Sequence, residues 1–174
     1  MKAALSILVL CEDVKRRMEA VAFCDRMVQR FWTSCEFDIN WVSYRDLADP
    51  GKFRTGVKQA ASAGLLIFAM RLASSIPPEV EAWMEAWLIQ RGEKEGSLIA
   101  LGDPGHIASA GISQNFVYLR GIARRGALDY LTEMPEKLGQ TIPDGIDAYP
   151  ERAQQMTSVL DQILRRKIPA PFRV

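Results

Sequence analysis

The chain has 174 residues, of which 48% are hydrophobic and 25% are charged. A chain of this size and composition can form one domain around its own core, without disulfides or a structural metal. Its 22 basic and 21 acidic residues leave a net charge of +1, so bulk charge favours binding to neither nucleic acid nor an anionic membrane. We therefore expect no nucleic-acid partner and no membrane partner.

The apolar run at 3–10 is short and is followed by two acids, which favours a first core strand over a signal peptide. No run reaches the roughly 18–20 apolar residues of a membrane span. The three cysteines, Cys11, Cys24 and Cys35, lack the close pairing of a redox or metal motif. Free thiols are typical of a reducing compartment, so the sequence predicts a cytoplasmic protein.

Short apolar segments recur at intervals of about thirty residues, the spacing that parallel strands with helical crossovers require. Three of them are nearly continuous in apolar character, which is typical of parallel strands covered on both faces. The second segment alternates instead, with Phe37, Ile39 and Trp41 on one face, as expected of an edge strand. The predicted strands are 3–10, 37–43, 65–70, 97–101 and 127–131.

Helical patterns fill the intervals between these strands. The first, at 14–32, places apolar residues on one stripe that we expect to face the core. That stripe consists of Val14, Met18, Val21, Val28 and Trp32. Further helices are predicted at 49–61, from Pro77 to about 91, at 113–125 and, after a turn-rich link, at 151–167.

The helix that begins at Pro77 carries two tryptophans one turn apart, Trp83 and Trp87. They share a side with Val80 and would ordinarily belong to the core. Two tryptophans nevertheless exceed what one helix needs against a sheet, so both are also candidates for a partner surface. Phe172, beyond the last helix, is a third candidate. We accordingly expect a protein partner or self-association.

Five predicted strands alternate with four helices, and the link and one more helix follow the fifth strand. Right-handed crossovers place the helices on both faces of such a sheet. An edge-like second strand favours the strand order 2-1-3-4-5 over 3-2-1-4-5, which would bury it. The sequence thus predicts an α/β domain at 1–134, a three-layer doubly wound parallel sheet of five strands. Residues 135–174 form a linker and an extra C-terminal helix that packs on the domain or on a partner.

Ligands of doubly wound sheets bind beyond the carboxyl ends of the strands, near the point where the strand order reverses. Glu12 and Asp13 follow the first strand there, Arg71 and Ser74 follow the third, and His106 follows the fourth. Carboxylate, guanidinium and imidazole groups can orient a polar substrate or exchange protons with it. These five residues are the candidate ligand cleft, and a small-molecule enzyme that uses this cleft is the alternative function.

The loop after the first strand has the wrong chemistry for a phosphate. A phosphate cradle requires small residues, hydroxyls and free main-chain N–H groups, whereas Glu12 and Asp13 would repel an anion. No P-loop or G-x-G-x-x-G motif follows a strand, and the hydroxyls and glycine with which flavodoxins bind FMN in this loop are absent. We expect no cofactor. A single histidine and scattered cysteines likewise predict no metal site.

The acid pair and the topology resemble the receiver domains of response regulators, within the flavodoxin-like class of folds, over residues 3–132. In receivers this pair helps to hold Mg²⁺, and an aspartate at the end of the third strand accepts a phosphoryl group. Here that strand ends in FAMR, without a carboxylate, and the fourth and fifth lack the family's Ser or Thr and its lysine. The resemblance implies a degenerate receiver: a non-catalytic bacterial signalling or protein-interaction module. Helix capping is the alternative role for Glu12 and Asp13.

Overall fold

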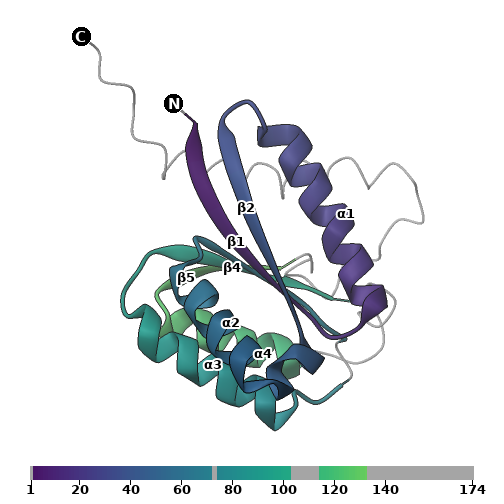
Figure 1. Ribbon diagram of the computed structural model, residues 1–174, viewed down its shortest axis with the longest axis vertical. Coiled ribbons are helices and arrows are strands. Elements are labelled where there is room, and N and C mark those ends of the chain that lie inside the picture. The colour runs from purple at the N-terminus through teal and green to yellow at the C-terminus, as the bar shows by residue number, and fades with distance from the viewer. Residues whose placement is uncertain (1, 72–73, 103–113, 133–174) are drawn as a thin grey trace, which may run out of the picture. The chain divides into compact units, whose positions relative to one another are not determined.

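The sheet is the centre of the fold in the computed structural model, which describes residues 2–71, 74–102 and 114–132 (Figure 1). Its five strands are parallel and run in the order β2-β1-β3-β4-β5. They are β1 (Ala3–Cys11), β2 (Cys35–Ser43), β3 (Leu65–Ala69), β4 (Gly96–Leu101) and β5 (Leu128–Thr132). The predicted α/β class and strand order are confirmed, with the alternating strand β2 at an edge.

Helices cover both faces of the sheet, as right-handed crossovers require. Figure 1 shows α1 (Val14–Phe31) on one side, and α2 (Pro50–Ser62), α3 (Pro78–Arg91) and α4 (Gln114–Arg125) on the other. A short 3-10 turn, η1 (Tyr44–Ala48), joins β2 to α2. The described residues belong to one compact unit. The predicted linker and C-terminal helix, at 135–174, lie outside them.

Alternate residues of the central strands enter different layers of the core. Leu8, Leu10, Leu66 and Phe68 pack with α2, α3 and α4, whereas Ile7, Val9 and Ile67 point to the opposite face and are equally buried. Burial on both faces explains why β1, β3 and β4 read as continuous apolar runs. Among the described residues, no helix is long and apolar enough to cross a bilayer.

Helix α1 buries a different face from the one that we predicted. Its core residues are Ala20, Phe23, Cys24, Met27 and Phe31. The predicted stripe is instead largely in solvent, with Val14 76%, Met18 70% and Trp32 61% exposed, and Val21 exposed as well. The helix therefore has two apolar faces, and the one with both phenylalanines buries more area against the sheet. We call the exposed set Val14, Met18, Val21 and Trp32 the α1 stripe.

The two tryptophans of α3 are core residues. Both are fully buried, and the Trp83 ring packs edge-on against Phe68 and Trp87 at centroid distances of 6.5 Å and 6.2 Å. The prediction that Trp83 and Trp87 form a partner surface is therefore wrong, because neither presents its ring to solvent. Phe172, the third candidate, lies outside the described residues.

The amino-terminal edge of the sheet is held together by a buried arginine at the end of α3. Arg91 donates from Nη1 to the carbonyls of Ala60 and Ala63, at 3.2 Å and 2.7 Å. Its Nε and Nη2 donate to the carbonyls of Lys94 and Glu95, at 3.1 Å and 2.9 Å. One guanidinium thus joins the end of α2 to the turn that leads into β4.

Candidate functional site

Glu12 is the centre of a hydrogen-bonded cluster at the carboxyl edge of the sheet. Its main-chain N–H donates to the Ala69 carbonyl at 3.0 Å, which places the side chain beside the end of β3. The carboxylate accepts the main-chain N–H of Arg71 at 2.6 Å and Arg71 Nε–H at 2.9 Å. The Ser74 hydroxyl lies 3.1 Å and 3.2 Å from its two oxygens. The Glu12 side chain is consequently only 9% exposed.

Asn115 bonds to both of the residues that supply these donors. Its side-chain amide donates to the carbonyls of Arg71 and Ser74, at 2.9 Å and 2.6 Å. It stands in the first turn of α4 and is buried. These bonds tie Arg71 and Ser74 to α4, so the cluster combines residues that follow β1, residues that follow β3 and a residue of α4. Sequence reasoning missed Asn115, because a helical asparagine gives no local sign of so distant a partner.

Asp13 has a structural role as the N-cap of α1. Its carboxylate accepts the main-chain N–H of Arg16 at 2.8 Å, which satisfies one of the free donors of the first turn. Its other oxygen lies 3.6 Å from Arg71 Nε. The capping alternative for the acid pair therefore describes Asp13, whereas Glu12 bonds to the β3–α3 segment instead. Both carboxylates are balanced by the Arg71 guanidinium, which is itself more than half exposed.

Neighbouring titratable groups are held in their neutral forms. Burial raises the pKa of the Cys11 thiol to about 11, despite the opposing charge of Arg17. Burial also raises the pKa of Tyr44, with a further contribution from the Glu12 charge. A thiol with this pKa is a poor nucleophile at neutral pH, because the thiolate is the reactive form. Cys11 and Tyr44 thus serve packing at this edge.

Asp46, in the loop after β2, is a third acid with a structural partner. It accepts bonds from the Ser43 N–H and hydroxyl at 2.9 Å and 2.8 Å, and from Lys52 Nζ at 2.7 Å. The bond from Lys52, followed by those from Ser43, lowers its pKa to about 2. Its reciprocal bonds with Ser43 form the capping box that begins η1.

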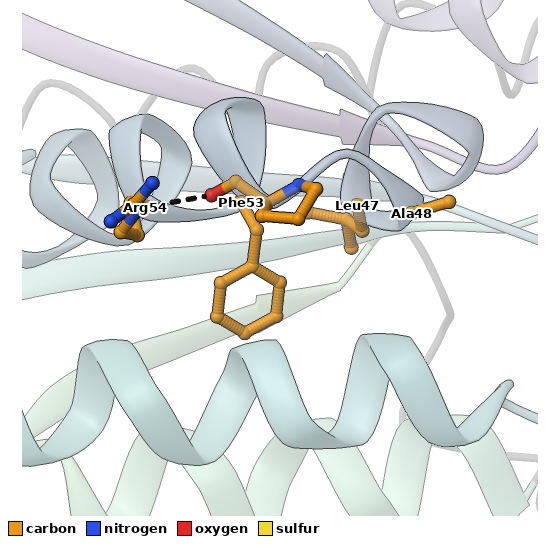
Figure 2. Close-up of a pocket in the computed structure, with 5 residues that line it drawn as sticks. Leu47, Ala48, Phe53 and Arg54 are labelled. Atoms are coloured by element: carbon orange, nitrogen blue, oxygen red, sulfur yellow. Dashed lines mark hydrogen bonds between the residues drawn. The ribbon is translucent and has the colours of Figure 1, made fainter.

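A shallow hollow lies along η1 and the first residues of α2. It has a volume of about 520 Å³ and is lined by Leu47, Ala48, Pro50, Phe53 and Arg54. Figure 2 shows the Phe53 ring pointing down from α2, and Arg54 bonded back to the Pro50 carbonyl at 3.2 Å. None of the five residues of the predicted ligand cleft lines this hollow. It therefore gives the enzyme alternative no support.

Four of the five predicted cleft residues lie together: Glu12, Asp13, Arg71 and Ser74. Their polar groups bond to one another and to main-chain groups, and among the two acids and Arg71 only Glu12 is largely buried. His106 lies outside the described residues, and its place in a cleft stays a prediction. Within the described part of the chain, no group of three or more His, Cys, Asp or Glu side chains could hold a metal ion.

No protein-family model matches the chain, and no curated protein matches it. Among solved structures, a flavodoxin-like domain from Synechococcus sp. has a TM-score of 0.52 and 15% identity, covering 92% of this chain and 99% of that one. A two-electron reduced flavodoxin from Megasphaera elsdenii has a TM-score of 0.46 and 15% identity, with 75% and 88% covered. The first likeness shows that the chain has the flavodoxin-like fold.

Proposed function

We propose that this chain is a non-catalytic protein-interaction module that binds its partner through the α1 stripe. The observation that carries the proposal is the exposure of Val14, Met18 and Val21 on one side of α1, in line with the exposed C-cap residue Trp32. Scattered exposed apolar residues are ordinary, but apolar residues gathered on one side of a helix are typical of an interaction surface. Its spacing suits a helix-in-groove or helix-to-helix contact.

The acids at the sheet edge support the non-catalytic part of the proposal. Receiver chemistry requires acids that are open to Mg²⁺ and an acceptor carboxylate at the end of the third strand. Glu12 is instead enclosed by Arg71 and Ser74, and Asp13 caps α1. At the end of β3 stand Ala69 and Met70, both fully buried and without a carboxylate. The described sheet edge therefore has neither an acid pair open to Mg²⁺ nor an acceptor carboxylate at the end of β3, which supports a degenerate receiver.

The charge around the α1 stripe favours an acidic partner over a second copy of the chain. Four of the five exposed charged residues of α1 are basic: Lys15, Arg17, Arg26 and Arg30, against Asp25. Two copies that met through α1 would bring like charges together, which opposes association. A partner helix with apolar residues in its centre and acidic residues at its rim would gain from both contacts.

The docking proposal is tested by titrating the protein with two labelled helical peptides that share a leucine stripe, one flanked by glutamates and one by lysines. We expect the glutamate peptide to bind about tenfold more tightly at low salt, because complementary charge steers and retains it. The double substitution of Val14→Ser and Met18→Gln should weaken its binding by about tenfold, since it removes two apolar contacts. Fluorescence anisotropy of the label measures both.

Matched controls are the isolated exposed apolar residues of other helices, Ile89 on α3 and Val117 on α4. Serine at either position should leave peptide binding unchanged. Equal affinity for the two peptides, or equal loss in the control variants, would contradict the proposal. So would a solution mass showing a dimer that Met18→Gln dissociates, because the stripe would then serve self-association.

The second expected result concerns phosphoryl transfer. Incubation with Mg²⁺ and acetyl phosphate should leave the intact mass of the protein unchanged, because β3 offers no acceptor carboxylate at its end. An authentic receiver domain in the same incubation provides the positive control. A magnesium-dependent phosphoryl adduct on this chain would show that the non-catalytic interpretation is wrong, whatever the result of the peptide titration.

A further inference from the structure

We propose that Arg71 and Ser74 form a carboxylate-binding site, whose ligand in the folded protein is the chain's own Glu12. The site consists of three donors: the main-chain N–H of Arg71, its Nε–H and the Ser74 hydroxyl. They stand 2.6 Å, 2.9 Å and 3.1 Å from the Glu12 carboxylate. A free monocarboxylate takes the same place when the Glu12 side chain is removed. This inference does not depend on the α1 stripe.

The donor geometry matches a planar anion with two oxygens. Arg71 N–H bonds to Oε2 and Arg71 Nε–H bonds to Oε1, so each oxygen has its own donor, while the Ser74 hydroxyl lies near both. Bonds of this kind, from charged or main-chain donors to a carboxylate, are the stronger hydrogen bonds of proteins. A phosphate would place further negative oxygens near Asp13 Oδ2, which already lies 3.6 Å from Arg71 Nε. The site therefore favours a monocarboxylate over phosphate.

The donors are held in place by bonds that do not involve Glu12. The buried Asn115 amide donates to the carbonyls of both Arg71 and Ser74, at 2.9 Å and 2.6 Å. Removal of the Glu12 side chain would therefore leave an arranged donor set beside a space of matching size, and a preorganised site binds its ligand at a smaller entropic cost.

The experiment is chemical rescue of Glu12→Ala by acetate, which has the carbon and oxygen atoms that the substitution removes. We expect the variant to melt below the wild-type protein, and acetate to raise its Tm along a saturable curve at constant ionic strength. At ten times its Kd, acetate should raise the folding equilibrium constant about elevenfold. Acetate should leave the wild-type Tm unchanged, because Glu12 fills the site. If Glu12→Ala is unfolded alone, recovery of the fold on adding acetate gives the same support.

Three variants make the test specific. Adding Ser74→Ala to Glu12→Ala should weaken acetate binding, because a donor is lost. Glu12→Gln should not respond to acetate, because its amide still fills the space. Glu85→Ala has the same change of charge, but its partner Arg125 lies on the exposed surface, so no response is expected there.

Several results would overturn the proposal. A folded Glu12→Ala variant indifferent to acetate would do so, as would a variant unfolded both with and without acetate. An equal response in Glu85→Ala would show a general salt effect. Stabilisation by inorganic phosphate equal to that by acetate would contradict the preference for a planar monocarboxylate.

Discussion

Replacing Arg91 with methionine is expected to lower the free energy of unfolding by about 3–5 kcal/mol, because several carbonyl oxygens would lose their donor, at about 1–3 kcal/mol for each one that is buried. Four carbonyl oxygens accept bonds from this one guanidinium, at 2.7–3.2 Å. Methionine preserves most of the buried volume but supplies no donor, so those acceptors lose a partner away from water. Urea denaturation followed by circular dichroism measures the loss.

The shape of the guanidinium matters as well as its charge. Arg91 reaches two carbonyls of α2 and two of the turn before β4, a planar fork that a lysine ammonium cannot reproduce. Arg91→Lys should therefore recover less than half of the lost stability. The neighbouring backbone is fitted to the same group: a methyl at Gly96 would meet the guanidinium and the Gly64 carbonyl.

The matched control is Arg125→Met. Arg125 makes the shortest bidentate ion pair among the described residues, with two bonds of 2.6 Å to Glu85. Both side chains are nevertheless about half exposed, and ion pairs at the surface contribute little to stability because water and salt screen them. If Arg125→Met proved as costly as Arg91→Met, the account of Arg91 as the buried connection between α2, α3 and β4 would be wrong.

The sheet could be predicted because the burial of a strand determines its sequence pattern: a strand covered on both faces is continuously apolar, and an edge strand alternates. The continuous runs at 3–10 and 65–70 correspond to β1 and β3, whose residues are covered on both faces. Alternation at 37–43 identified β2 as an edge, and Phe37, Ile39 and Trp41 are indeed only half-buried. The strand order 2-1-3-4-5 then followed, because it places this solvent-exposed strand at the edge of the sheet.

The inward face of α1 could not be predicted in the same way. Its sequence has two apolar stripes, of which the prediction took only one, and periodicity alone does not indicate which stripe meets the sheet. Phe23 and Phe31 are buried, whereas Met18 and Trp32 are largely exposed to solvent. The choice depends on complementarity with residues far away in sequence. The same limit hid Asn115, whose partners are 41 and 44 residues away.

The candidate site was partly accessible to sequence reasoning. Parallel strands that neighbour one another end at the same edge, so Glu12 after β1 and Arg71 after β3 were expected to lie close together. The sequence could not show that Glu12 and Arg71 would bond to each other. Their pairing depends on the main-chain N–H of Arg71, which is directed at the Glu12 carboxylate. Residue types alone do not distinguish an open cleft from a closed cluster.

The contrast between two tryptophans gives the second large expected effect. Trp83→Ala should lower the free energy of unfolding by about 3–5 kcal/mol, as large-to-small substitutions in well-packed cores do. The Trp83 ring is fully buried and packs edge-on against Phe68 and Trp87. It also lies close to Gly56, where an added Cβ would be 3.0 Å from Trp83 Nε1. Neighbours on two helices and the sheet would face the resulting cavity.

Trp32→Ala, on the α1 stripe, should change stability by no more than about 0.5 kcal/mol, because exposed sites away from special features contribute little. Lys2 over its ring, 5.5 Å from the centroid, is a surface contact.

Trp83→Phe should cost less than Trp83→Ala, because it keeps most of the packing and removes an indole N–H that has no hydrogen-bond partner among the described residues. Equal losses for Trp83→Ala and Trp32→Ala would contradict the assignment of one tryptophan to the core and the other to the interaction surface. Loss of peptide binding on Trp32→Ala, without loss of stability, would tie that surface to function.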